Sequence, residues 1–111
     1  MIKHGKKVLL TTTIRLTTIT QQAQGLRGKT IRPQEAYIFT LPMTSRFFAT
    51  VDMFFMKQPL LLIWLNNKTI VDIREAQPWS IHLPKEPANM LIETHLHNKK
   101  KFHVGQQLTI T

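Results

Sequence analysis

The sequence predicts one mainly β domain, a compact barrel-like or sandwich fold of about six or seven short strands with one or two helical turns. Three observations support this class. Apolar residues make up 42% of the 111 residues, enough for one hydrophobic core but not for two. Segments with period-two alternation or short apolar runs recur along the chain. Proline, glycine and asparagine separate these segments at short intervals.

The first predicted strand covers residues 7–20, KVLLTTTIRLTTIT. Its six threonines disfavour a helix because β-branched side chains lose χ1 freedom there. The alternation predicts one buried face. That face would carry Val8, Leu10, Thr12, Ile14 and Leu16. Residues 1–7 are predicted to be a basic N-terminal arm that becomes ordered on binding, and residues 8–111 the β-rich domain.

A helical turn and two strands are expected next. Residues 20–28 can form one helical turn, with Thr20 as its cap and glycines at its end. Residues 36–41, AYIFTL, predict a short strand that Pro42 closes. Residues 47–56, FFATVDMFFM, are aromatic-rich and predict a further strand.

The clearest hairpin lies in the middle of the chain. Residues 60–65 form a continuous apolar run, which is typical of a strand buried on both faces. Residues 66–68, Asn-Asn-Lys, predict a tight turn because asparagine tolerates the left-handed backbone. Residues 69–74 are the returning strand.

The last third predicts smaller elements. Three prolines make residues 77–87 a loop, and residues 89–94 predict a strand. Residues 95–102 are polar and basic and predict one helical turn. Residues 104–106 form a turn before a terminal strand at 107–111.

The positive charge is unevenly distributed. The formal net charge is +9, yet residues 35–98 contain five bases and six acids. Residues 1–34 contain seven bases and no acid, and three consecutive lysines follow at 99–101. Such asymmetry favours a polyanionic partner.

We expect that partner to be nucleic acid, RNA more than DNA, or a ribonucleoprotein assembly, rather than a membrane or a small-molecule substrate. Lysine and arginine neutralise phosphates without reading sequence. The candidate contacts are Lys3, Lys6, Lys7, Arg15, Arg27, Lys29, Arg32, Lys99, Lys100 and Lys101. Trp79 lies in the proline-rich loop and is the candidate for base stacking. Phe47 and Phe48, like Phe54 and Phe55, are adjacent, so on a strand one of each pair would point outward. Core packing is nevertheless expected for all aromatics except Trp79, so contact with the RNA backbone is favoured over sequence readout.

Catalysis is not expected. The six acids are scattered, and no nucleophile elbow, phosphate loop or zincin motif is present. Glu93, His95 and His97 would share one face of a strand and suit zinc or iron. The strand is expected to end near Thr94, so these side chains would diverge, and no metal or other cofactor is predicted. A metal-dependent enzyme that uses them remains the third hypothesis.

The cellular setting is predicted from what the chain lacks. It has no cysteine, which excludes disulfides and thiolate metal sites. Its longest apolar run is six residues, and no export signal is visible. We therefore expect a cytoplasmic protein.

Several short motifs occur in an order that resembles the domain of unknown function 192 family. They are QGLRGK at 24–29, AYIF at 36–39, FFMK at 54–57, the hairpin at 59–73 ending in IVDI, the strand at 88–93 and VGQQL at 104–108. The resemblance covers residues 12–108 and implies a small β-rich, barrel-like domain. The chain departs from the family pattern in several places. Gln58 and Pro59 stand where the family has Asn-Thr, and several residues are missing there. Arg27 replaces a methionine, and Leu61 and Gln106 replace acids.

A second reading follows from the same resemblance. The domain would bind a protein or a small ligand, and its charge would serve solubility alone. This hypothesis expects a buried polar pocket near residues 54–57, altered here by the loss of the two acids.

Overall fold

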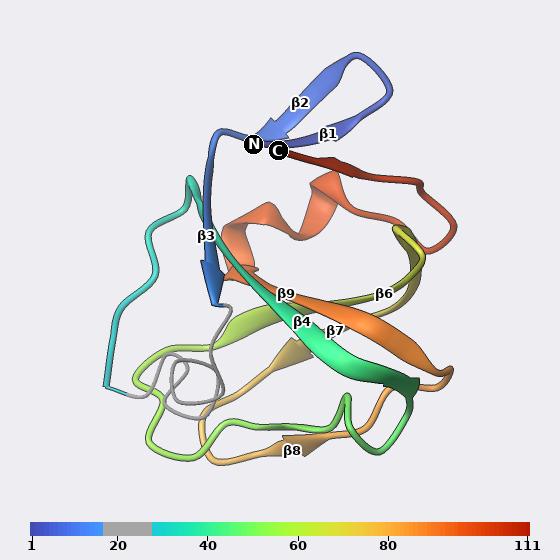
Figure 1. Ribbon diagram of the computed structural model, residues 1–111. Coiled ribbons are helices and arrows are strands. Elements are labelled where there is room, and N and C mark those ends of the chain that lie inside the picture. Colours follow the sequence, from blue (N-terminus) through green and yellow to red (C-terminus); the bar gives the residue numbers. More distant parts are fainter. Residues whose placement is uncertain (17–27) are drawn as a thin grey trace.

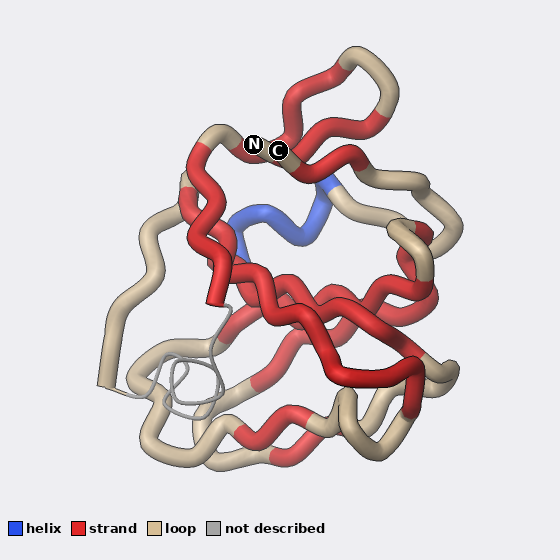
Figure 2. Tube along the Cα trace, in the orientation of Figure 1, coloured by secondary structure: helices blue, strands red, loops and turns tan. Residues whose placement is uncertain are grey.

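The computed structural model describes residues 1–16 and 28–111, and it confirms the mainly β class. The strands form three sheets (Figure 2). Of the two forms that the sequence predicted, barrel-like or sandwich, the structure is sandwich-like. Within the described residues the largest sheet stays open, because its edge strands β3 and β7 do not pair with each other. The elements are β1 (Ile2–His4), β2 (Lys7–Leu10), β3 (Thr12–Leu16), β4 (Glu35–Ser45), β5 (Val51–Asp52), β6 (Leu60–Asn66), β7 (Thr69–Ala76), β8 (Ile81–His82), β9 (Ala88–His95), the 3₁₀ helix η1 (Leu96–Lys101) and β10 (Thr109–Ile110).

The central sheet has the strand order β3-β4-β9-β6-β7, and β6 lies inside it. Every residue from Leu60 to Leu65 is buried, as the apolar run predicted. The side chains alternate between two clusters: Leu61, Ile63 and Leu65 join one, and Leu60, Leu62 and Trp64 join the other. Because successive strand residues point to opposite faces, the two clusters lie on opposite faces of the sheet.

The hairpin between β6 and β7 is also confirmed. Its turn residues Asn67 and Lys68 have φ of 50° and 69°, the left-handed backbone that a two-residue hairpin loop requires. Asn67 is well suited to this conformation. The turn is tied further to β9 by a hydrogen bond from the Asn67 amide N–H to Asn89 Oδ1 at 3.1 Å.

Two layers cover the faces of the central sheet (Figure 1). On one side lie η1 and the small sheet β10-β1-β2, which bury Ile2, Leu10 and Phe102 against it. On the other side lie β5, β8 and their loops, which bury Val51 and Met53. We call these the hairpin layer and the loop layer. Candidate binding residues that the sequence analysis grouped together, such as Lys99 and Trp79, therefore lie on opposite sides of the central sheet.

The N-terminal arm prediction is wrong. Residues 1–7 form β1 and begin β2, and β1 pairs with β2 on one side and β10 on the other. Ile2 is fully buried in the core. Burial of this side chain and two rows of backbone hydrogen bonds outweigh the flexibility that three lysines would favour.

The single strand predicted at 7–20 is interrupted. The chain leaves the small sheet after Leu10 and joins the central sheet at Thr12. Leu9 and Leu10 are both buried whereas Val8 is 43% exposed, so the predicted parity does not hold. Because the chain passes from one sheet to another after Leu10, the alternation of buried and exposed side chains in β2 does not continue into β3. Residues 17–27 lie outside the described part, and with them the predicted helical turn except for Gly28.

Two other boundaries are corrected. Strand β4 continues through Pro42, because its pairing with β9 is irregular between Thr40 and Ser45 and needs no N–H there. Of residues 47–56 only Val51 and Asp52 form a strand. Side chains hold the flanking turns: Ser45 Oγ accepts from the N–H of Phe47 at 3.0 Å, and short polar side chains compete with sheet pairing in this way.

The C-terminal elements agree with the sequence. The predicted helical turn is η1, and Asn98 fixes it to the sheet. Its Nδ2 donates to the carbonyl of Pro33 at 2.7 Å and to Thr94 Oγ1 at 2.9 Å. The predicted 77–87 loop contains the short strand β8, which pairs with β5.

Candidate nucleic-acid interface

The hairpin layer contains no acidic residue. Its elements come from residues 1–10 and 96–111, and neither segment has an Asp or Glu. Strand β3, beside it, is also acid-free and adds Arg15. All of the basic side chains in these segments except half-buried Lys3 are exposed. They are Lys3, Lys6, Lys7, Arg15, Lys99, Lys100 and Lys101.

Direct contacts join the basic segments, which are far apart in the sequence. Lys101 Nζ donates to the carbonyl oxygen of Leu9 at 3.3 Å, which links η1 to β2. Arg15 Nη2 lies 3.4 Å from the carbonyl of Ile110, which links β3 to β10. The structure therefore brings seven of the ten predicted basic residues to one side of the molecule, where β1, β2 and η1 lie together (Figure 1).

One of these lysines has an acidic neighbour from the central sheet. Lys99 Nζ lies 3.7 Å from Glu75 Oε1 on β7, and both side chains are about half exposed, at 51% and 54%. An ion pair this open to water is weak and exchanges readily for another anion. Glu75 therefore holds Lys99 only weakly.

The other predicted bases lie elsewhere. Arg27 falls outside the described residues. Lys29 lies on the segment that runs beside residues 55–58, since the N–H of Gly28 donates to the carbonyl of Phe55 at 3.2 Å. Arg32 is exposed, and its N–H donates to Glu35 Oε1 at 2.8 Å. The structure does not join Lys29 to the hairpin layer.

Trp79 is exposed as predicted, with 61% of its surface accessible. It lies in the loop layer, so the central sheet separates it from the lysines of η1. Its ring centroid lies 4.9 Å from that of Phe55, which is 63% exposed. Phe55 is a surface residue that the sequence analysis assigned to the core. The doubled phenylalanine in FFMK was a signal, because one member of such a pair on a strand that is buried on a single face would point outward.

The three possible metal ligands diverge. Glu93 is buried within β9, whereas His97 is exposed on η1. His95 lies between them and caps η1 by accepting a hydrogen bond from the N–H of His97 at 3.0 Å. Among the described residues no group of three His, Asp or Glu side chains is placed to hold a metal ion.

A serine and a histidine meet in the loop layer. Ser80 Oγ lies 2.8 Å from His82 Nε2 and 2.6 Å from the carbonyl of Gln77. A carbonyl only accepts, so the hydroxyl proton of Ser80 points to Gln77 and the imidazole N–H donates to Oγ. This is the reverse of the arrangement in which a histidine activates a serine. Burial, and then the charge of Arg74, lower the pKa of His82, so its ring is neutral near pH 7.

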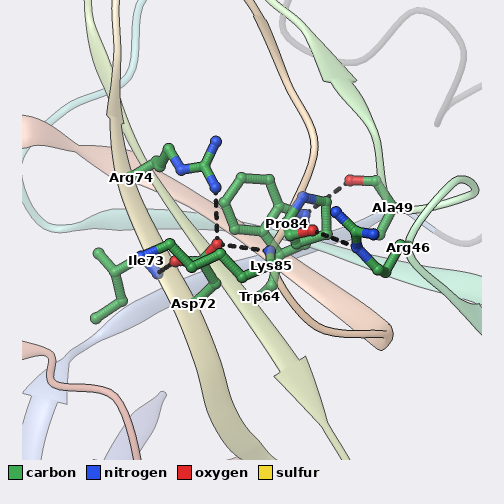
Figure 3. Close-up of polar contacts among 8 residues, drawn as sticks. All are labelled: Arg46, Ala49, Trp64, Asp72, Ile73, Arg74, Pro84 and Lys85. Atoms are coloured by element: carbon green, nitrogen blue, oxygen red, sulfur yellow. Dashed lines mark hydrogen bonds and ion pairs between the residues drawn. The ribbon is translucent and has the colours of Figure 1, made fainter.

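Beneath the loop layer a buried carboxylate organises several backbone segments (Figure 3). Asp72 Oδ2 accepts from Arg74 Nη2 at 3.0 Å and from the N–H of Lys85 at 2.9 Å. The guanidinium of Arg74 also lies 5.7 Å from the ring centre of Trp64. These charges stabilise the loop rather than form a ligand site.

The region predicted to hold a pocket is partly core. Met56 is buried in the loop-layer cluster, Phe54 is half-buried, and Lys57 is exposed. Gln58 binds the backbone of Ile31 through both ends of its amide, at 2.7 and 3.3 Å. This amide links two loops.

The fold and surface define a small sandwich-like β domain with a basic layer on one side. The chain belongs to the DUF192 family, "Uncharacterized ACR", whose model matches residues 2–110. The expected family is thus confirmed. This chain is 39% identical over 79 residues to a UPF0127 protein of Pyrococcus abyssi, and the match covers 68% of each chain. A UPF0127 protein of Pyrococcus furiosus is 38% identical over 63 residues, 56% of this chain and 54% of that one.

Two solved structures share the fold. A Sinorhizobium meliloti protein, named as a "putative transcription regulator", superposes with a TM-score of 0.78 at 22% identity, over 87% of this chain and 79% of that one. A protein of unknown function from Novosphingobium aromaticivorans gives 0.71 at 21% identity, over 88% and 72%. At these identities the likeness concerns the fold. Among the described residues no helix has the length and apolarity to span a bilayer.

Proposed function

We propose that this chain is a non-enzymatic domain that binds the phosphate backbone of RNA through its hairpin layer, alone or within a ribonucleoprotein. The observation that carries the proposal is the acid-free composition of that layer, where Lys101 bonds to the carbonyl of Leu9. All six acids of the chain lie between residues 35 and 93, outside the hairpin layer. A surface of one charge sign attracts polyanions and raises their local concentration.

The chemistry of the layer favours backbone contact over base readout. All six of its Lys and Arg residues are lysines, which act as point charges with three rotatable donors and suit phosphates in many orientations. Residues 1–10 and 96–111 contain neither tyrosine nor tryptophan, and their one phenylalanine, Phe102, is buried. Contact with a duplex or structured RNA through phosphates and 2′-hydroxyls needs no stacking platform.

Binding of a mixed-sequence RNA duplex, followed by fluorescence anisotropy over a range of salt concentrations, tests the proposal. The logarithm of the affinity should fall linearly with the logarithm of the salt concentration, and the slope of about −0.9 per neutralised phosphate known for B-form DNA sets the scale for the A-form RNA duplex. The variant Lys6→Gln/Lys7→Gln/Lys100→Gln should reduce the magnitude of this slope by about 2–3. These three side chains are exposed, so the fold should be unaffected.

The matched control removes the same charge from the loop layer, with Lys29→Gln/Lys57→Gln/Lys85→Gln. It should keep the salt slope of the parent protein on the duplex. Equal loss in the two triple variants would mean that net charge alone matters, and the hairpin layer would not be the interface. No binding at low ionic strength would refute the proposal altogether.

A further inference from the structure

Two exposed aromatic residues in the loop layer have an unusual backbone. Phe55 and Trp79 have φ of 64° and 67°, a left-handed conformation that is disfavoured for bulky side chains. Their rings meet at 4.9 Å with an interplanar angle of 58°, and Phe54 adds a third ring 5.9 Å from Trp79. Strained conformations persist where the surrounding structure imposes them, and they concentrate at binding sites.

Hydrogen bonds through one core residue impose this arrangement. Met53 is buried, and its carbonyl accepts from the N–H of Trp79 at 2.8 Å and of Met56 at 3.3 Å. Its own N–H donates to the carbonyl of Ser80 at 2.7 Å. Trp79 is therefore held directly by Met53, and Phe55 lies in the turn that the Met56–Met53 bond closes, with its own carbonyl accepting from the N–H of Gly28 at 3.2 Å.

Two exposed lysines lie on the backbone segments that adjoin Phe55. The Gly28–Phe55 backbone bond and the Gln58 amide bonds to Ile31 align residues 28–31 with residues 55–58. Exposed Lys29 and exposed Lys57 each lie within this pair of aligned segments. The acid of the loop, Asp52, has its Oδ1 turned to the N–H of Phe54 at 3.2 Å.

We infer that Phe55 and Trp79 form a stacking platform for unpaired bases of a single-stranded nucleic acid, with Lys29 and Lys57 contacting its phosphates. Aromatic faces next to cations match a ligand that is both aromatic and anionic. A purely apolar protein surface would gain nothing from the two ammonium groups. The inference rests on the proposed function and extends it: the hairpin layer would hold paired segments and the platform would hold unpaired ones.

Tryptophan fluorescence gives a direct readout. The chain has two tryptophans, and Trp64 is fully buried, so quenching by added oligouridylate reports on Trp79. We expect strong quenching in the parent protein and none in Trp79→Phe. Trp79→Ala and Phe55→Ala should each weaken oligouridylate binding about tenfold, while duplex binding stays unchanged.

Two controls separate stacking from other effects. Phe47→Ala removes a phenylalanine that is 77% exposed and has no ring contact among the described residues, and it should bind like the parent. Lys29→Gln/Lys57→Gln should lower the magnitude of the oligouridylate salt slope by about 1.4, since single strands contribute about −0.7 per phosphate. Circular dichroism of each variant checks that the sheet is retained.

The outcomes distinguish this inference from the proposed function. If the duplex binds but oligouridylate binds the Phe55 and Trp79 variants as well as the parent, the platform is refuted and the hairpin layer stands. Self-association in sedimentation that Trp79→Ala abolishes, without any oligouridylate effect, would make the patch a protein contact and also refute the platform. If neither nucleic acid binds at low ionic strength, both ideas fail.

Discussion

The indole Nε1 of Trp64 donates a hydrogen bond of 2.7 Å to the carbonyl oxygen of Ala49. Both residues are fully buried, and the bond joins the middle of β6 to the segment that leads into β5 (Figure 3). The loop layer is thus attached to the central sheet by a polar contact as well as by apolar packing. A buried carbonyl that loses its partner carries a desolvation penalty.

Trp64→Phe should therefore destabilise the protein by about 1–3 kcal/mol, because Ala49 keeps its burial but loses its donor. Trp64→Ala adds a cavity and should cost about 3–5 kcal/mol. Urea unfolding followed by circular dichroism measures both. A Trp64→Phe protein as stable as the parent would show that water or a shifted backbone replaces the bond.

Loss of the buried carboxylate of Asp72 should lower the free energy of unfolding more than loss of the exposed carboxylate of Glu75. Asp72→Ala leaves Arg74 and the N–H groups of Ile73 and Lys85 without their acceptor, and hydrogen bonds to charged groups contribute about 1.5–3 kcal/mol. Glu75→Gln breaks only the exposed pair with Lys99 and should cost about 0–0.5 kcal/mol. Paired urea titrations compare the two; similar losses would contradict the assignment of Asp72 as the structural acid.

Stability should fall in mild acid partly through His82. Burial and the charge of Arg74 lower its pKa below 6.5 in the folded state, so the unfolded chain binds the proton more readily. Its contribution is complete above about pH 6.5 and is lost as the pH falls towards the lower folded pKa. Melting temperatures from about pH 7.5 to about pH 5 should fall less steeply in His82→Gln than in the parent. Parallel curves would show that His82 does not contribute to the fall.

Tyr37 is the single tyrosine in the chain, so its ultraviolet absorbance titration reports one group. Burial, and then the charge of Glu35, raise the pKa of its phenol above 10.0. The titration midpoint should exceed 10.0 and move down in Glu35→Gln, which removes the second cause. A midpoint unaffected by Glu35→Gln would leave burial as the sole cause.

Local sequence patterns correctly predicted the elements that depend only on residue type and near neighbours, such as the buried strand β6 and the turn at Asn67. The run at 60–65 has no polar face to place, so it could only be an interior strand, and β6 is one. Asn67 similarly determined the tight hairpin through its backbone preference. The predictions at residues 1–7 and 47–56 failed because pairing with β10 and side-chain capping by Ser45 are contacts that local pattern does not specify.

The sequence by itself determined the β class, the central hairpin and the absence of acids from both ends of the chain, because each depends on residue type and near neighbours. Tertiary structure decided which of these residues meet. Packing of β1 between β2 and β10 carries the two acid-free ends onto one face, where Lys101 reaches Leu9. Bonds through Met53 place Trp79 beside Phe55 on the opposite layer. Such long-range contacts follow from burying two faces of one sheet, which no short stretch of sequence encodes.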